Sequence, residues 1–402
     1  MQSLTTRRLL LGLFLLCFAC RLSLVFITGQ HLKPQHRELY YLAQSIAEGR
    51  GYGNPYAIPT GPTTHFSPGV PLVLAAALKL FGTGMIGDIA IYTVNAAAAS
   101  LLYALLPITA VLIGLPQRSG LIAALVGILV PIHFLVELHD SPGVFAALCL
   151  QALVLLTARM WREERLMTRF GTVYGFACGV ILLFSPQLLP VCIAFLALTS
   201  LQYRRAALWF AAASAATAIC VLLPWAVRNA VVLGSPIFLR GNFGLELQVS
   251  NNDLSGPSIA QNGESFKLYH PFVNRAECDR IVRLGEVSYM HSKLQQAAGW
   301  IESHPQHFAV LTAERVRLFW FPKAYRWYQT ALIWALTAMA LVGLVMIRNS
   351  HRVAFRLIAA IWIMYPLVYY VVQWDNRYRY PIHWTILLLA SQLMMVGRSK
   401  TI

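Results

Sequence analysis

One carboxylate stands at the head of a polar stretch that lies between two apolar segments. The stretch ELYYLAQSIAEGRGYGNPYAIPTGPTTHFSPGVPLVLA, residues 38–75, begins with Glu38, and residues 38–48 predict a short helix. The glycines and prolines that follow predict turns. Such a stretch would hold the Glu38 carboxylate beside a surface that lipid can approach. The carboxylate can then act as a general base on a lipid-linked substrate, or it can be an ordinary solvated loop residue.

Two arginines near the end of the chain have the chemistry of an anion-binding site. Arg377 and Arg379 lie in QWDNRYRYP, residues 373–381, directly before the last apolar run. A guanidinium has planar donors that match two oxygens of a phosphate. The alternative is that this segment is a belt of aromatic and basic side chains that only anchors the helix at the membrane surface.

Composition places the chain among proteins that cross a membrane several times. The 402 residues are 57% hydrophobic and only 12% charged, and the formal net charge is +16. This apolar content exceeds what a water-soluble domain of the same length needs. The positive charge indicates basic loops on the cytoplasmic side of a membrane, so we expect no nucleic-acid partner.

The cysteines give no sign of a disulfide or of a metal site. Six of the seven lie in apolar runs, where cysteine acts as a small hydrophobic residue, and Cys278 stands alone in a polar segment. The sequence also lacks the spacing that is typical of metal ligands. We therefore expect no metal and no other cofactor, with a divalent cation as the open alternative.

Apolar runs long enough to cross a membrane recur along nearly the whole chain. A shorter apolar piece, 70–82, is bounded by proline and glycine. If it lay in the membrane, five basic turns further along the chain would move outside, against the rule that cytoplasmic loops are basic. We therefore expect 70–82 to be a helix on the outer surface. Ten spans remain, near residues 9–28, 88–114, 120–138, 142–158, 171–184, 187–202, 206–226, 328–347, 355–373 and 381–396.

This topology divides the chain into three parts. Residues 1–227 form an N-terminal transmembrane module that contains the first outer loop, 29–87. Residues 228–327 form a long extracytoplasmic loop, and residues 328–402 supply the C-terminal transmembrane helices. Both termini then lie in the cytoplasm, and we expect a multi-pass protein of the inner cell membrane.

Several stretches resemble one family of membrane enzymes. In chain order they are ELYYLAQSIAEGRGY followed by TGPTTHFSPGVPLVLAAALKLFG, PWAVRNAVVLGSPIFLRGNFGLELQVSNN (224–252), HPFVNRAECDRIVRLGEVSYMHSKLQQAAGWIESHP (270–305) and DNRYRYPI (375–382). They resemble bacterial GT-C glycosyltransferases, the polyprenyl-phosphate-sugar-dependent membrane enzymes related to protein O-mannosyltransferases and lipid A aminoarabinose transferases (glycosyltransferase family 39). The likeness covers most of the chain, in the same order.

The resemblance implies a fold and a reaction. The fold would be an all-α polytopic bundle of the GT-C type, with about ten transmembrane helices, an outer-surface juxtamembrane helix and a helical extracytoplasmic loop. The reaction would be the inverting transfer of a sugar from a polyprenyl-phosphate donor. The acceptor would be a glycan, a lipid or a protein at the outer face of the membrane.

The resemblance also implies a base and a phosphate site. Family members carry an acidic base in the first outer loop; the usual aspartate position holds Gln35 in this chain, so the role passes to Glu38. One carboxylate is sufficient, because a polyprenyl phosphate leaves without being protonated and only the acceptor hydroxyl must lose its proton. Phosphate binding is expected from Arg377 and Arg379, and also from Arg228.

Further substrate contacts are expected from His65, Asp140, Asn229 and Tyr378. Asp140 matches an acid that relatives place in the second outer turn, and capping of the helix that begins near residue 142 explains it nearly as well. Arg21 lies within the first span. It either has a function there or pairs with Glu38 or Asp140.

Two other functions stay open at the level of sequence. One is an O-antigen ligase or polysaccharide polymerase, which would use a polyprenyl diphosphate glycan. The other is a lipid or solute transporter. The chain has no evident repeat of the kind that many transporters contain, which counts against the transporter.

Overall fold

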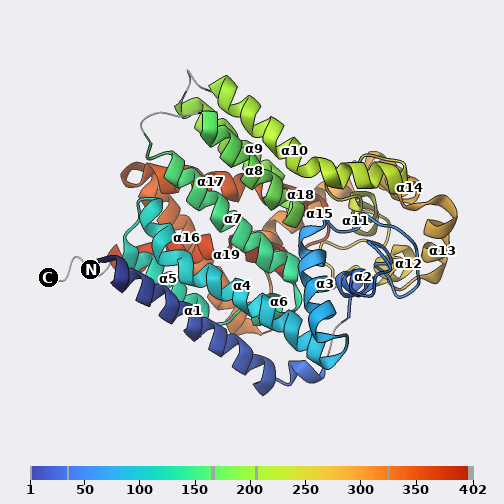
Figure 1. Ribbon diagram of the computed structural model, residues 1–402, viewed down its shortest axis with the longest axis horizontal. Coiled ribbons are helices and arrows are strands. Elements are labelled where there is room, and N and C mark those ends of the chain that lie inside the picture. Colours follow the sequence, from blue (N-terminus) through green and yellow to red (C-terminus); the bar gives the residue numbers. More distant parts are fainter. Residues whose placement is uncertain (1, 34–35, 164–167, 204–206, 325, 397–402) are drawn as a thin grey trace.

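The computed structural model describes residues 2–33, 36–163, 168–203, 207–324 and 326–396. Over these ranges the chain is built from helices, and its β pairing consists of two isolated bridges. Figure 1 shows most of the long helices running side by side, with a group of shorter helices at one end of this bundle. The expected all-α architecture is therefore confirmed.

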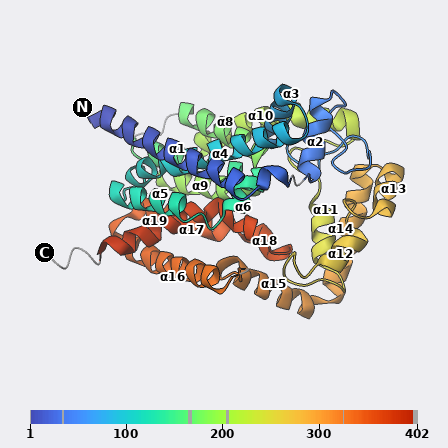
Figure 2. The same ribbon diagram turned by 90° about the horizontal axis from the view of Figure 1, so that it is seen from below.

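Six helices of the described chain are long and apolar enough to cross a membrane, which makes this a membrane protein. They are α1 (Gln2–Ile27), α4 (Met85–Leu112), α7 (Ser141–Met160), α10 (Ala207–Leu233), α16 (Trp327–Ser350) and the pair α17 (Arg352–Met364) and α18 (Leu367–Val371). Shorter apolar helices stand at the other expected spans: α5 (Gln117–Leu129), α8 (Thr168–Phe184), α9 (Leu189–Gln202) and α19 (Tyr380–Val396). Figure 2 shows that α1 begins and α19 ends at the same end of the bundle.

The bundle has one large apolar core, to which α4, α5, α7 and α19 all contribute. Small residues let α5 approach α4 closely, as is usual for helices that pack in membranes. A Cβ atom added to Gly120 of α5 would lie 2.5 Å from the backbone oxygen of Leu106 in α4. The close packing of α4 and α5 therefore depends on glycine at this position.

One expected span is shorter than predicted. The run 120–138 reads as a single apolar helix, but α5 ends at Leu129 and a separate short helix, α6 (Phe134–His139), follows it. Pro131 lies at the break. A proline has no backbone N–H and cannot continue a helix, which explains why the run is divided.

The short helix α6 is tied to the bundle by a buried ion pair. Its Glu137 pairs with Arg21 of α1, and both side chains are almost fully buried. Glu137 also accepts a hydrogen bond of 2.7 Å from Tyr103 of α4. The sequence left pairing with Glu38 or Asp140 as one alternative for Arg21, and the structure gives it Glu137 as its partner. Its pairing with Glu137 instead fixes α6, which ends directly before Asp140.

The opening stretch of the sequence forms two helices that pack together. The predicted helix 38–48 is α2 (Glu38–Ala47), and the predicted surface helix 70–82 is α3 (Gly69–Phe81). Tyr40 and Ala43 of α2 pack against apolar side chains of α3, which include Leu74. This contact holds the first residue of α2, Glu38, close to the membrane helices.

A helical lobe completes the molecule; it consists of residues 48–68 and 243–303. Its helices are α11 (Phe243–Ser250), α12 (Gly263–Tyr269), α13 (Arg275–Leu284) and α14 (Glu286–Ser303), and α15 (Pro305–Trp320) leads back to the bundle. Tyr56 from the first loop shares a core with Leu245, Ile281 and Tyr289 of these helices. Segments about two hundred residues apart are therefore packed into one unit.

Candidate active site

A cavity of about 310 Å³ lies where the bundle meets the helical lobe. Its walls come from α2, α3, α11, the start of α7, the residues around α18, and two 3-10 helices, η2 (Pro186–Leu188) and η4 (Asn376–Arg379). Apolar side chains line it together with three carboxylates and two arginines. Among the residues predicted from the sequence, the cavity brings together Glu38, Asp140, Arg377 and Tyr378.

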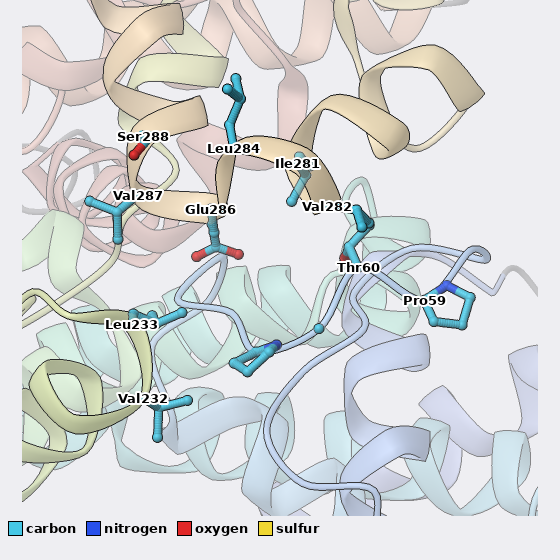
Figure 3. A pocket seen from close by; sticks show the side chains of 13 residues that line it. Pro59, Thr60, Val232, Leu233, Ile281, Val282, Leu284, Glu286, Val287 and Ser288 are labelled. Atoms are coloured by element: carbon cyan, nitrogen blue, oxygen red, sulfur yellow. The ribbon is translucent and has the colours of Figure 1, made fainter.

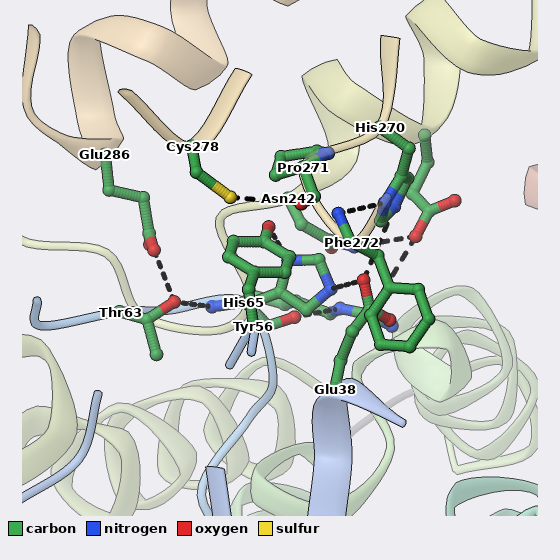
Figure 4. Close-up of polar contacts among 12 residues, drawn as sticks. Glu38, Tyr56, Thr63, His65, Asn242, His270, Pro271, Phe272, Cys278 and Glu286 are labelled. Atoms are coloured by element: carbon green, nitrogen blue, oxygen red, sulfur yellow. Dashed lines mark hydrogen bonds and ion pairs between the residues drawn. The ribbon is translucent and has the colours of Figure 1, made fainter. Parts of the chain in front are cut away.

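Glu38 faces the cavity with two histidines behind it (Figure 4). Its Oε1 atom lies 3.5 Å from Nε2 of His65 and 3.4 Å from Nε2 of His270. The backbone N–H of Phe272 donates to Nδ1 of His270 at 3.2 Å, so a neutral His270 carries its proton on Nε2, facing Glu38. Tyr56 supports the other ring, with its hydroxyl 3.3 Å from Nδ1 of His65.

This surrounding keeps Glu38 ionised. Removal from water raises the pKa of its carboxyl, but the electrostatic effect of His65 and then His270 at the acidic pH where this carboxyl titrates outweighs it and holds the pKa at about 2. Removal from water also lowers the pKa of His270, so that ring is mostly neutral near pH 7. The Glu38 side chain is 21% exposed, whereas its Oε1 atom is buried. The other oxygen, Oε2, is therefore the one available to a ligand.

Three polar side chains around the start of α11 form another wall. Arg240 donates from Nε to the backbone oxygen of His65 at 2.6 Å, and its guanidinium lies 4.7 Å from the centre of the Phe66 ring. Asn242 donates to Glu246 at 2.9 Å, and Nη2 of Arg240 lies 3.8 Å from the same Glu246 oxygen. Arg240 is thus a cation whose position is fixed at the edge of the cavity.

Asp140 lies between α6 and α7, beside the positive end of the α7 dipole. Its side chain makes no regular capping hydrogen bond, but a hydrogen bond from the backbone of Gly143 in the first turn of α7 lowers its pKa, so the alternative role of helix cap stays open. Its carboxylate folds back onto Gly143, where an added Cβ atom would lie 2.4 Å from Oδ2. Removal from water raises the pKa of Asp140 to about 6, and Arg377 only partly opposes this. The pKa of Asp140 is thus raised toward neutral pH, whereas that of Glu38 is lowered.

Arg377 is a second cation at the cavity, on η4. Its Nε atom lies 3.8 Å from Asp375 and has no hydrogen-bond partner among the described residues. Its Nη2 donates to the hydroxyl of Tyr378 at 3.4 Å, and the Tyr378 ring stacks on Tyr369 at 4.5 Å. Burial lowers the pKa of Arg377, but Tyr378, Asp375 and Asp140 together raise it above its usual value. The guanidinium therefore stays charged, and although its Nε atom is buried, the side chain as a whole is 29% exposed and lines the cavity.

Three predicted site residues lie outside the cavity. Arg228, at the end of α10, donates to the backbone oxygens of Thr63 at 3.0 Å and Tyr52 at 2.6 Å, so its guanidinium is already used. Asn229 is fully buried and donates to the backbone oxygen of Ile237 at 2.6 Å. His65 is also fully buried and contacts Glu38 from behind. The structure thus places Asn229 and His65 as buried supports of the site, and it places Arg228, which is half-buried, against the first loop outside the cavity.

Arg379 is also placed elsewhere. It is fully buried, donates to the hydroxyl of Thr337 in α16, and forms no ion pair within the described chain. Residues two apart in a 3-10 helix face different directions, so Arg377 and Arg379 cannot both face one cavity. The prediction that Arg379 binds the donor phosphate does not fit this arrangement.

Sequence reasoning missed Arg240, Asn242, Glu246 and His270. All four lie in stretches that carry the family resemblance, but their polar character alone gave no reason to single them out. One signal was present. Asn242 and Glu246 are four residues apart, so a helix starting there places both on one face.

A second cavity, of about 440 Å³, opens on the helical lobe (Figure 3). It is lined by apolar residues of α10, α13 and α14, among them Leu233 and Ile281, and by residues 59–62. Its one titratable lining residue is Glu286, whose carboxylate is bound to Thr63 and Thr64. Because this cavity offers no free charged group, the smaller cavity is the candidate active site.

Within the described residues, no group of three or more histidine, cysteine, aspartate or glutamate side chains is arranged to hold a metal ion. The prediction of no bound metal stays a prediction. The positive charge at the site comes from the two arginines, Arg240 and Arg377.

Comparisons with known proteins give one informative likeness. No protein-family model matches the chain, and no curated protein matches it. Among solved structures, it is similar to the Archaeoglobus fulgidus oligosaccharyltransferase tethered, via a disulfide bond, with an acceptor peptide containing the NVT sequon. The TM-score is 0.56 and the sequence identity is 16%.

The likeness covers 97% of this chain and 50% of the oligosaccharyltransferase, so this chain spans half the length of its structural neighbour. At this identity the likeness shows the fold. The chain therefore shares the helical membrane fold of this oligosaccharyltransferase, which agrees with the fold class that the sequence predicted.

Proposed function

We propose that this protein is an inverting glycosyltransferase that moves a sugar from a polyprenyl-phosphate donor to an acceptor hydroxyl. One observation carries the proposal: a cavity at the end of a GT-C-type bundle combines an ionised carboxylate, Glu38, with two arginines and an apolar wall. These are the parts that a base, a phosphate and a lipid chain each require.

In the proposed step, Glu38 acts as the base through Oε2. The acceptor oxygen forms a bond to the anomeric carbon while its proton passes to Glu38, and the bond from that carbon to the phosphate oxygen breaks. The phosphodiester, with one negative charge, becomes a polyprenyl phosphate with two. Direct attack from the face opposite the phosphate inverts the anomeric carbon. The pKa of Glu38 at about 2 leaves it ionised, and the acceptor hydroxyl becomes acidic enough only as the new bond forms.

The growing charge on the phosphate needs cations, and Arg377 and Arg240 supply them. Arg377 lines the cavity with a partly exposed side chain, and the carboxylates beside it keep its guanidinium charged. Fixed cations at a developing phosphate charge stabilise the transition state more than the bound substrate. The apolar wall, with Val70 of α3, Phe184 of α8 and Val368 of α18, continues into the membrane helices and fits a polyprenyl chain.

The basic turns between the apolar runs support a site on the extracytoplasmic face of the inner membrane. The acceptor is a glycan, a lipid or a protein. The structural neighbour is tethered with an acceptor peptide, which supports a protein as the acceptor.

The direct test is transfer by the purified protein in lipid nanodiscs. A panel of undecaprenyl-phosphate sugars is supplied, and release of undecaprenyl phosphate is measured with and without candidate acceptors. Release from a monophosphate donor supports the proposal. Release only from a diphosphate-linked glycan would favour the ligase or polymerase, and substrate accumulation in vesicles without any transfer would favour a transporter.

Orientation gives a second prediction. Thr83 is exposed in the turn between α3 and α4, so a cysteine at Thr83→Cys should react in intact cells with a thiol reagent that does not cross membranes. Arg118→Cys, exposed at the start of α5, is the matched control and should react only after the membrane is permeabilised. The opposite pattern would place the site in the cytoplasm.

Asp140 gives a pH prediction. Its pKa is raised to about 6, so it is ionised above this pH and becomes protonated as the pH falls through it. Ionised Asp140 helps to hold Arg377 at the phosphate, so kcat/KM for the donor should fall below about pH 6. Asp140→Asn should be less active and should lose this acid limb. An unchanged limb in Asp140→Asn would assign it to another group.

A further inference from the structure

The turn that carries His65 is held by charged side chains from three distant parts of the chain. Thr63, Thr64 and His65 are each at most 1% exposed. Their ligands come from the end of α10, from the segment before α11 and from the first residue of α14. A short loop that is fully buried and bound on three sides is fixed in position, which an ordinary outer loop is not.

Glu286 makes the largest set of these contacts (Figure 4). Its Oε1 atom accepts from the backbone N–H of Thr64 at 2.6 Å and from the Thr64 hydroxyl at 2.7 Å. Its Oε2 atom accepts from the hydroxyl of Thr63, and the Thr63 oxygen in turn accepts from the backbone N–H of His65 at 2.9 Å. Gly285, with φ of +76°, forms the turn that places Glu286 at the start of α14. Three donors on one carboxylate form a strong attachment.

Two arginines complete the attachment on the carbonyl side. Arg228 donates to the backbone oxygen of Thr63 at 3.0 Å, and Arg240 donates to the backbone oxygen of His65 at 2.6 Å. The turn therefore has its N–H and hydroxyl groups bound by one anion and its carbonyl groups bound by two cations. Each attachment limits the freedom of the His65 ring, which lies 3.5 Å from Glu38.

We infer that Glu286 is a positioning residue for the catalytic base, acting through Thr63, Thr64 and His65 on Glu38. This inference rests on the proposed function for its effect on catalysis. His65 and His270 lie 3.5 and 3.4 Å from the buried Oε1 of Glu38, which leaves Oε2 as the oxygen toward the acceptor. If the turn shifts, the Glu38 carboxylate can rotate. Arg228, expected from the sequence to bind phosphate, belongs to the same attachment.

Kinetics of Glu286→Gln test the inference. Glutamine keeps the size of the side chain but replaces one acceptor oxygen with an NH₂ group, so the attachment of Thr63 or Thr64 is lost. We expect kcat to fall by about 10- to 100-fold, because small displacements of a catalytic group have effects of this size. The KM for the donor should change less than kcat, because Glu286 is linked to only one of the two phosphate cations, Arg240, and to it only through the turn. Glu286→Asp should recover part of the rate.

The double variant with Glu38→Gln separates positioning from general stability. A residue that acts only through Glu38 has no further effect once the base is absent. Adding Glu286→Gln to the Glu38→Gln variant should therefore not lower kcat any further. An equal loss in both backgrounds would overturn the inference. Glu264→Gln is the matched control, since Glu264 is an exposed glutamate of the same lobe that is paired with Lys267, and its loss should leave kcat unchanged.

A chemical readout is independent of the reaction. His65 should be protected from diethyl pyrocarbonate in the wild-type protein and modified faster in Glu286→Gln, with exposed His304 and His307 as internal references. If the wild type transfers no sugar but His65 becomes reactive in the variant, the attachment is supported and the proposed function fails. If the wild type is active while the variant matches it in kcat and His65 reactivity, the inference is overturned.

Discussion

Glu38→Gln should lower the rate of sugar transfer by about 10²- to 10⁴-fold, the usual contribution of a positioned general base. Glutamine keeps the size of the side chain and can still lie beside His65 and His270. It cannot take the proton of the acceptor hydroxyl. The measurement is release of undecaprenyl phosphate in nanodiscs under saturating donor, together with the amount of folded protein in the membrane, which should match the wild type.

Two further variants serve as comparisons for Glu38→Gln. Glu48→Gln, at the other end of α2, removes an exposed carboxylate that pairs with Arg50 and should leave the rate unchanged. Glu38→Asp should keep some activity, limited by its shorter reach. Near-normal transfer in Glu38→Gln together with an inactive Asp140→Asn would move the base to Asp140. The GT-C-type fold would stand, and our assignment of the base would be wrong.

The bundle was largely predictable because its physical cause is local. Apolar runs of span length predict membrane helices, and basic turns predict the orientation of these helices. Neither prediction depends on contacts with distant parts of the chain. The prediction of one continuous helix failed at a place where a single residue interrupts the apolar run. Pro131 divides the run 120–138, and the apolar residues on either side of it gave no sign of the break. The partner of Arg21 was missed for the same reason, since Glu137 reaches Arg21 only because α6 is separate from α5.

The candidate site was predictable in part. Glu38, Asp140 and Arg377 stand in short segments at the ends of helices, where the topology itself brings them to one end of the bundle. The directions of the arginine side chains were not predictable. Arg228 and Arg379 are each close in sequence to the right region, but Arg228 is drawn to carbonyl groups of the first loop and Arg379 is packed between helices.

The histidine beside Glu38 shows most clearly which contacts the sequence could not predict. His270 reaches Glu38 because α12 ends beside the first loop, which depends on the core shared by Tyr56, Leu245 and Tyr289. Contacts that arise from the packing of two distant loops have no periodicity and no fixed spacing in the sequence. The same packing brings Glu286 to Thr63 and Thr64.

Arg377→Ala should lower kcat/KM for the donor by about 10²- to 10³-fold, the usual effect of removing one fixed donor from a developing negative charge. Arg377→Lys should keep part of the activity, because a point charge remains but the planar pair of donors is lost. The acid limb should also disappear in Arg377→Ala. The limb arises because ionised Asp140 holds Arg377 at the phosphate, so the protonation of Asp140 has no further effect once Arg377 is absent. Both effects are read from kcat/KM measured across the pH range.

Arg379→Met is the matched control for Arg377→Ala, since the two arginines are neighbours in sequence but lie on different sides of η4. Arg379 contacts Thr337 rather than the cavity, so the KM for the donor should not change. Its guanidinium is buried without an acidic partner, so an apolar side chain of similar length should be tolerated or even stabilise the bundle. If Arg379→Met lowered kcat/KM for the donor as much as Arg377→Ala does, Arg379 would be assigned to the phosphate site after all. That result would also mean that η4 turns when the donor binds, because the present arrangement lets only Arg377 reach the cavity.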